Sequence, residues 1–188
     1  MSRTSNINKS IHGFPIDITL NIDGQGKNNI STGVGMLDHL LQLFSKHGKF
    51  DIDISCQADL NVDDHHLVDE IGMNLGLAFK NALNQAEKSN INRYGFFILP
   101  MDEALITCAV DFCQRSSFVF DVKFSREKIG DLSTEMIREF WNMFSQKAEI
   151  NFIVKSEYGV NDHHIAEALF KCAARTINIA LSINKINL

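Results

Sequence analysis

The sequence predicts an α+β fold in which one half-domain, a mixed β-sheet backed by helices, occurs twice in tandem. A short histidine motif is duplicated, because residues 64–69 are Asp-His-His-Leu-Val-Asp and residues 162–167 are Asp-His-His-Ile-Ala-Glu. The segments before the two motifs also match, with Leu-Phe-Ser-Lys at residues 43–46 and Met-Phe-Ser-Gln at residues 143–146. Chance rarely repeats a motif together with the helix and strand before it, so we expect two copies of one supersecondary unit.

Short strands and helices interleave along the chain, which leaves little room for the long crossovers of a parallel sheet. This spacing favours sheets that are each covered by helices on one side. Residues 87–92 are predicted to form a polar link between the two copies. We therefore expect a first repeat over residues 1–88 and a second over residues 89–188, which together form one compact catalytic unit.

The first repeat is predicted from alternation, turn residues and caps. Residues 16–22 alternate apolar and polar side chains and end at Asp23 and Gly24, as expected for a strand followed by a turn. Asp63 or Asp64 can cap the helix that begins with the first histidine pair. The expected elements are a strand over residues 16–22, a helix over 35–44, a strand over 50–55 and a helix over 65–83.

The second repeat is predicted in the same way, with Asp162 as the cap of the last helix. The expected elements are strands over residues 94–99, 104–112 and 117–124, a helix over 132–144, a strand over 150–154 and a helix over 162–179. Residues 50–54 correspond to residues 150–154 at an offset of 100. A weaker match pairs residues 16–20 with residues 105–109.

Composition favours a cytoplasmic enzyme and excludes several other classes. The net charge is −5 and the pI is about 5.8, which argues against a nucleic-acid-binding surface or an acidic membrane as a partner. No apolar run reaches the roughly 18 residues of a membrane span. The four cysteines form no CxxC spacing and lie within apolar strand or helix patterns, so we expect buried, reduced thiols.

The duplicated motifs have the spacing of metal ligands. Positions i and i+4 share one face of a helix, so His163 and Glu167 can bind one ion together. His164 lies about 100° around the helix axis and must face something else. Imidazole and carboxylate donors without thiolate suit Mn²⁺, Fe²⁺ or Zn²⁺, whereas a lone histidine such as His12 is more often a surface residue. The two motifs together predict ligands for two metals.

Three cations stand out near the predicted elements. Arg93 and Arg115 lie at strand ends, and Lys171 lies four residues after Glu167 on the same helix face. Each one alone is more often a salt-bridge partner. Beside a metal centre, the three would form a rim that binds a phosphate, because guanidinium and ammonium groups match that dianion.

Six separate motifs resemble the imidazoleglycerol-phosphate dehydratases of histidine biosynthesis. The resemblance runs from about residue 17 to residue 179, and its motifs are residues 35–41, 47–51, 63–66, 92–95, 100–105 and 163–171. It implies a hydro-lyase that converts imidazoleglycerol phosphate, a phosphorylated imidazole, to imidazole-acetol phosphate. It also implies a ribosomal protein S5 domain 2-like repeat, trimers that assemble into a homo-oligomer of 24 subunits, and two Mn²⁺ ions per active site at subunit contacts.

The resemblance also implies roles for particular residues. The expected metal ligands are His39, His65, His66, Asp69, Glu139, His163, His164 and Glu167. The expected substrate-binding residues are His47, Arg93, Arg115 and Lys171. From the chemistry of the site, the expected catalytic residues are His47, Asp102, Glu103 and Lys171, of which the first three are candidate proton carriers because the usual N-terminal glutamate is absent.

The chain differs from the family pattern at several positions. Asp69 stands where the family has glutamate, and Gly13 stands where a glutamate reaches the substrate. Ser116 replaces a usual proline, and the chain stops before a family segment that closes over the phosphate. These differences keep open a catalytically impaired or non-enzymatic metal-binding homologue. A third hypothesis is a metallohydrolase that releases inorganic phosphate from an imidazole or phosphate ester.

Overall fold

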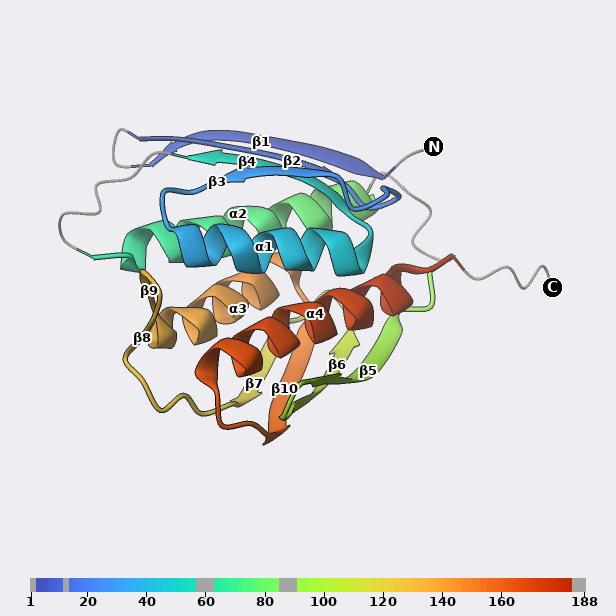
Figure 1. Ribbon diagram of the computed structural model, residues 1–188. Helices are drawn as coiled ribbons and strands as arrows, with labels where there is room; N and C mark the ends of the chain where they lie inside the picture. The colour runs from blue at the N-terminus through green and yellow to red at the C-terminus, as the bar shows by residue number, and fades with distance from the viewer. Residues whose placement is uncertain (1–2, 12–13, 57–62, 85–90, 184–188) are drawn as a thin grey trace.

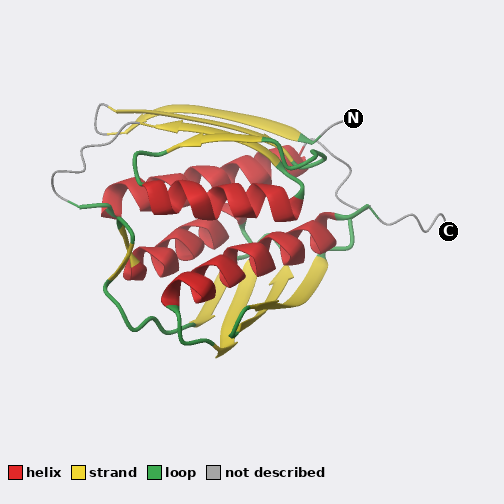
Figure 2. Cartoon of the chain, viewed as in Figure 1, coloured by secondary structure: helices red, strands yellow, loops and turns green. Residues whose placement is uncertain are grey.

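The computed structural model describes residues 3–11, 14–56, 63–84 and 91–183. Two sheets enclose two layers of helices, so that the order is sheet, helices, helices, sheet (Figure 1). Helices α1 and α2 lie against the first sheet, and α3 and α4 lie against the second (Figure 2). The predicted α+β class, with helices on one side of each sheet, is confirmed.

The first repeat contains four strands and two helices among the described residues. They are β1 (Thr4–Ile11), β2 (Phe14–Asn21), β3 (Asn28–Ser31), α1 (Gly35–Gly48), β4 (Asp51–Cys56) and α2 (His65–Asn84). The second repeat contains β5 (Tyr94–Met101), β6 (Ala104–Asp111), β7 (Ser117–Asp121), β8 (Lys128–Ile129), β9 (Leu132–Ser133), α3 (Thr134–Ala148), β10 (Asn151–Tyr158) and α4 (Asp162–Leu181). The predicted boundary at residue 88 lies outside the described residues and stays a prediction.

Both main sheets have the same topology. The strand orders are β1-β2-β4-β3 and β5-β6-β10-β7, with two antiparallel pairs and one parallel pair in each. Lys49 and Glu149 both end a helix in the left-handed conformation, at an offset of 100 residues. The duplication therefore extends from the sequence motifs to the strand order and to the helix ends.

The weak strand match that the sequence predicts is wrong by one residue. Ile16 and Ile18 of β2 are buried, and their counterparts on β6 are Ile106 and Cys108, which are also buried. The offset is therefore 90 residues rather than 89. A shift of one residue along a strand exchanges its two faces, so only the 90-residue offset keeps the apolar side chains of both repeats inward.

Two glycines bring α2 and α3 close together. A Cβ atom at Gly72 would lie 2.6 Å from the carbonyl oxygen of Phe140, and one at Gly76 would lie 2.4 Å from that of Phe144. Both glycines lie on one face of α2 because they are four residues apart. The close approach brings the histidine motif at the start of α2 beside the first turns of α3.

The core between the helix layers is strongly aromatic. Trp141 is completely buried and packs edge-on against Phe44 and Phe140, with ring centroids 5.7 and 5.1 Å apart. Phe152 and Phe170 contact the same indole from β10 and α4. This packing fixes the relative positions of the four helices, which carry most of the predicted site residues.

The predicted caps of α2 and α4 are partly wrong. Asp63 accepts a hydrogen bond from the His65 amide, as predicted for a cap. The carboxylate of Asp64 instead accepts hydrogen bonds from the amide and hydroxyl of Ser133. The cap of α4 is Asn161, which bonds the His163 amide. The buried Asp162 instead bonds the segment at residues 125–126. A carboxylate that ties the motif to another segment cannot be told from a cap by sequence alone.

Several element boundaries also differ from prediction. Strand β1 was not predicted because its sequence is mostly polar, and it forms as an edge strand paired with β2 along its whole length. The short strand β3 was missed for the same reason. Helix α3 starts at Thr134 rather than at residue 132, because residues 132–133 pair with β8.

The expectation of four buried thiols holds for two of the cysteines. Cys108 and Cys172 are buried, and the Cys172 thiol bonds the carbonyl of Phe97. Cys56 and Cys113 are partly exposed, because they lie at a strand end and in a turn. Among the described residues, no helix is long and apolar enough to cross a membrane.

Candidate metal centre

The first half-site, defined here as His39, His163 and Glu167, lies where α1 contacts α4. One carboxylate oxygen of Glu167 lies 2.7 Å from Nε2 of His39 and 3.1 Å from Nε2 of His163. The three potential ligand atoms lie within 4.8 Å of one another. His163 and Glu167 share a helix face through their i, i+4 spacing, and α1 brings in the third donor.

Lys171 closes the first half-site from the next turn of α4. Its ammonium donates to the other oxygen of Glu167 at 2.6 Å and to Sδ of Met101 at 3.4 Å. Burial acts to raise the pKa of Glu167, but the hydrogen bonds from Lys171 and His39 hold that pKa at about 2. Glu167 is therefore an anion that can serve as a ligand.

The second half-site, defined here as His65, Asp69 and Glu139, lies where α2 contacts α3. Nε2 of His65 lies 3.2 Å from Oδ2 of Asp69, again at i, i+4 spacing. The other oxygen of Asp69 is buried without a hydrogen-bond partner. Burial raises the pKa of Asp69, and the negative charge of Glu139 raises it further. A cation at this point would relieve both penalties.

The second histidine of each motif turns away from its half-site. Nδ1 of His164 lies 2.7 Å from a carboxylate oxygen of Glu103, in the turn between β5 and β6. Oδ2 of Asp102 lies 3.5 Å from Nε2 of the same ring. The exposed ring of His66 stands at 79° to that of His65. Adjacent histidines on a helix thus face different partners, as the 100° step between residues predicts.

The first half-site fits a divalent cation, because its three donor atoms already converge. In the second half-site, His65 and Asp69 are paired, but the two oxygens of Glu139 accept hydrogen bonds from Arg138 and Asn142. Two imidazoles with one carboxylate, and one imidazole with two carboxylates, are donor sets that suit Mn²⁺, Fe²⁺ or Zn²⁺. Three protein donors leave coordination positions open, as in catalytic rather than structural metal sites. The buried Asp69 oxygen without a hydrogen-bond partner is the strongest single indication of a cation site, because burying such an oxygen is costly.

His47 lies in the last turn of α1, near the first half-site. Burial lowers the pKa of its imidazole, and the positive charges of Lys171 and Arg175 lower it further. His47 is therefore neutral at pH 7 and able to accept a proton. Arg175 was not among the predicted site residues, although it lies four residues after Lys171 on the same face of α4.

Arg93 and Arg115 lie at the opposite end of the second sheet. Arg93 pairs with Asp111 at 2.7 Å, and its carbonyl accepts the amide of Phe112, which leads into the turn with Arg115. Nine residues of α4 separate Lys171 from Ala180, whose carbonyl accepts the Arg93 amide, so at about 1.5 Å per residue roughly 14 Å separates the backbones of the two cations. Each cation is ion-paired on its own side, Arg93 with Asp111 and Lys171 with Glu167. Within one chain, the predicted rim of three cations is therefore not assembled.

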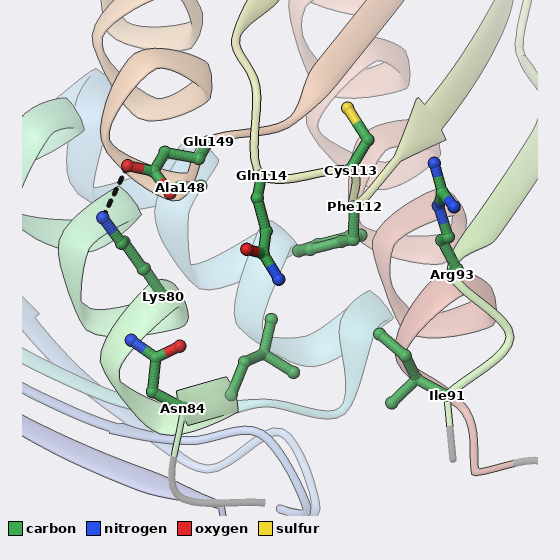
Figure 3. A pocket seen from close by; sticks show the side chains of 10 residues that line it. Lys80, Asn84, Ile91, Arg93, Phe112, Cys113, Gln114, Ala148 and Glu149 are labelled. Atoms are coloured by element: carbon green, nitrogen blue, oxygen red, sulfur yellow. Dashed lines mark hydrogen bonds and ion pairs between the residues drawn. The ribbon is translucent and has the colours of Figure 1, made fainter. Parts of the chain in front are cut away.

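Arg93 lines a separate cavity of about 240 Å³ (Figure 3). Lys80 and Glu149 form an ion pair on one side of it, and Cys113 and Gln114 border it from the turn after β6. Among the described residues, none of the eight predicted metal ligands lines this cavity. The cavity is thus distinct from both half-sites of the same chain.

Sequence reasoning missed Asp131, which supports the first half-site. Its carboxylate accepts the amides of Gly35 and Met36 at 2.6 and 2.8 Å and so caps α1, the helix of His39. The two partners are separated by about a hundred residues. No local pattern marks such a cap, because the usual capping side chain comes from the residue just before the helix.

Fold and site together define a duplicated α+β protein with a cluster of histidines and a carboxylate that could hold a metal ion. The family model of imidazoleglycerol-phosphate dehydratase matches residues 32–177. The chain belongs to the imidazoleglycerol-phosphate dehydratase family, and it is accordingly an enzyme of the hydro-lyase class.

Relatives and solved structures agree over nearly the whole chain. The dehydratase of Clostridium botulinum is 47% identical over 186 residues, which cover 99% of this chain and 94% of the relative. That of Caldicellulosiruptor bescii is 45% identical, covering 96% and 92%. The crystal structure of the Staphylococcus aureus dehydratase superposes with a TM-score of 0.87 at 31% identity, covering 96% of this chain and 99% of that one. These comparisons give no support to a non-enzymatic homologue.

Proposed function

We propose that this chain dehydrates imidazoleglycerol phosphate to imidazole-acetol phosphate and water, as a metal-dependent step of histidine biosynthesis in the cytoplasm. The observation that carries the proposal is the first half-site, where the i, i+4 pair of His163 and Glu167 meets a third donor, His39, from α1. The family to which the chain belongs supports the same reaction.

We propose two Mn²⁺ ions per active site. His39, His163 and Glu167 would hold one ion, and His65, Asp69 and Glu139 would hold the other. His66 and His164 face away from the half-sites of their own chain, so we assign them to metal sites that are completed by a neighbouring copy. Bound metal would act as a Lewis acid on the substrate imidazole and favour its deprotonated ring.

The residues of the chain would then move protons and hold the substrate. The hydroxyl on the carbon next to the ring leaves with a proton as water, the next carbon loses its hydrogen, and the resulting enol becomes the ketone. His47 is the leading candidate to carry the proton, since its neutral imidazole can accept it. Asp102 is the second candidate, because its side chain is exposed beside His164. Both oxygens of Glu103 already accept hydrogen bonds.

The phosphate would be held by Lys171 together with Arg93 and Arg115. The Arg93 amide bonds the carbonyl of Ala180, so the rise of α4, about 1.5 Å per residue, places the Arg93 backbone roughly 14 Å from that of Lys171 and roughly 20 Å from that of Glu167. Substrate contact by all three cations therefore needs arginines from a second copy. This argument supports a homo-oligomer whose active sites lie at subunit contacts.

The outer face of the second sheet supports assembly as well. Phe96 and Ile98 of β5 and Ile153 of β10 point outward, and Phe96 is 74% exposed. At the equivalent positions of the first sheet, the residues are Asn6, Asn8 and Asp53. An exposed apolar face on one of two equivalent sheets is typical of a protein interface. We propose that this face packs against other copies in a trimer, from which a 24-mer is built.

A turnover assay tests the function. Purified protein with Mn²⁺ is expected to release the ketone from imidazoleglycerol phosphate, and chelation of the metal or His164→Ala is expected to abolish this. His12→Ala, which changes a histidine outside both motifs, is the matched control. Metal uptake without ketone would instead favour the non-catalytic homologue, and release of inorganic phosphate would favour a metallohydrolase.

A second experiment tests the assembly. Phe96→Asn and Ile153→Asp give the second sheet the residues of the first, and both are expected to reduce the particle mass in analytical ultracentrifugation. Thr19→Asn, on the outer face of the first sheet, is the control and is expected to leave the mass unchanged. A wild-type protein that sediments as a monomer would overturn the assembly proposal.

A further inference from the structure

Glu103 joins three parts of the site with a single carboxylate. One oxygen lies 2.7 Å from Nδ1 of His164. The other accepts the backbone amide of Asn161 at 2.8 Å and that of Val160 at 3.3 Å. Asn161 is the residue that caps α4 by bonding the His163 amide. The turn between β5 and β6, the start of α4 and the imidazole of His164 are therefore held together by one side chain.

The hydrogen-bond directions fix which nitrogen of His164 carries hydrogen. A glutamate carboxylate only accepts hydrogen bonds, and one oxygen of Glu103 already accepts the amides of Asn161 and Val160. Nδ1 of His164 must therefore be the donor. In the neutral ring, this leaves the lone pair on Nε2, which is the form that binds a metal through Nε2.

We propose that Glu103 is a positioning residue, which fixes the Nδ1–H tautomer and the ring orientation of His164 so that Nε2 is presented to a divalent metal ion. The inference rests on the proposed metal role of His164. A metal-binding histidine commonly donates its other ring N–H to a carboxylate, and loss of such a partner typically lowers metal affinity or activity by about 10- to 100-fold.

Glu103→Gln separates this role from a merely structural one. In one orientation the carboxamide oxygen accepts the Asn161 amide, and its NH₂ group then faces Nδ1 of His164 and favours hydrogen on Nε2. In the other orientation the NH₂ group opposes the Asn161 amide, donor against donor. The second orientation would keep hydrogen on Nδ1, but only at the cost of that clash, so the ligand-competent form of His164 is disfavoured although the side chain keeps its size.

The test combines Mn²⁺ binding with the tautomer of His164. Titration with Mn²⁺, followed by the electron paramagnetic resonance of the free ion, is expected to show a site roughly 10- to 100-fold weaker in Glu103→Gln. Glu103→Asp retains the anion and is expected to lose less. Glu157→Gln, which removes an exposed carboxylate paired with Lys155, is the control and should bind Mn²⁺ like the wild type.

Nitrogen-15 spectra of the metal-free protein supply the second readout. We expect neutral His164 to carry its hydrogen on Nδ1 in the wild type and in Glu103→Asp, and on Nε2 in Glu103→Gln. Unchanged Mn²⁺ affinity in Glu103→Gln, or an Nε2–H tautomer in the wild type, would overturn the inference. If Glu103→Gln does not fold, the inference is tested by the His164 tautomers of the wild type and Glu103→Asp. Absence of Mn²⁺ binding by the wild type would instead overturn the proposed function.

Discussion

The two half-sites are built on equivalent positions but differ in charge. His39 on α1 corresponds to Glu139 on α3 at an offset of 100 residues, and Glu167 corresponds to Asp69 at an offset of 98. The first half-site thus has two imidazoles and one carboxylate, whereas the second has one imidazole and two carboxylates. The scaffold was duplicated, but the ligands were not kept the same.

The neighbouring positions increase this difference. Lys171 donates to Glu167 in the first half-site, whereas the equivalent position of the second half-site is Met73. With neutral histidines, the charge of Lys171 offsets that of Glu167 and the charge of Arg138 offsets that of Glu139, which leaves Asp69 as a carboxylate without a cationic neighbour of this kind. We infer that the second half-site is the stronger cation site, and that the first leaves an ammonium available for an anionic substrate.

Removal of one carboxylate from each half-site has the largest expected effect on this comparison. A metal ion contributes several kcal/mol of charge stabilisation, so Glu167→Gln and Asp69→Asn should each lower kcat/KM on the order of 10³-fold. Steady-state kinetics with saturating Mn²⁺ measures the loss. Glu135→Gln, an exposed carboxylate in the first turn of α3, is the control. Near-normal turnover in either variant would show that the two half-sites are not both catalytic.

Lys171→Met makes the first half-site resemble the second. Loss of a charged hydrogen bond to phosphate costs about 1.5–3 kcal/mol, so KM for imidazoleglycerol phosphate should rise roughly 10- to 100-fold. The Mn²⁺ affinity should not fall, because Glu167 loses a competing cation. Steady-state kinetics and Mn²⁺ titration together check that KM rises while the Mn²⁺ affinity does not fall. The exposed Lys147→Met is the control. A weaker metal site with unchanged KM would contradict the division of roles.

Asp162→Asn and Asp64→Asn compare the two supports of the histidine motifs. Asp162 is 2% exposed and accepts the amides of Ser125 and Arg126, whereas Asp64 is 8% exposed and bonds only Ser133. An amide side chain leaves buried donors unpaired, so we expect losses of about 2–3 kcal/mol and about 1–2 kcal/mol, respectively. Denaturant unfolding of the metal-free protein measures both, with the exposed Asp53→Asn as reference. Equal losses would mean that the deeper burial of Asp162 adds nothing.

A change in the pKa of His47 is the smallest expected effect. Burial and the charges of Lys171 and Arg175 lower this pKa, so Lys171→Met should raise it towards its ordinary value of 6.5. Since the folded-state pKa lies below that of the unfolded chain, stability is lost as pH falls below 6.5. Proton NMR titration of the metal-free protein measures the pKa directly. A wild-type pKa above 6.5 would contradict the neutral-base assignment.

The sequence predicted the local geometry of the site well. The i, i+4 spacing brings His163 to Glu167 and His65 to Asp69, because helix geometry is set by the chain itself. The turn of His164 away from His163 followed from the same geometry. The prediction for Gly13 stays untested. Gly13 corresponds to Glu103 at the 90-residue offset, but it lies outside the described residues.

Long-range contacts were not predictable in the same way. No spacing in the sequence indicated the cap of α1 by Asp131 or the pairing of Glu103 with His164. Strand β1 was missed because its pattern is polar, although pairing with β2 makes it a strand. For Asp131, Glu103 and β1, the stabilising interaction comes from a partner outside the local segment.

By itself, the sequence determined the duplicated α+β class, the helix faces that carry the histidine motifs and the family of the chain. Periodicity along a helix or strand is a local property, so a motif at fixed spacing retains its meaning wherever the element packs. Only the tertiary structure decided that α1 meets α4 and α2 meets α3, and that the three cations of the predicted rim lie apart within one chain. Those outcomes depend on packing between segments that are distant in the sequence, which no local spacing encodes.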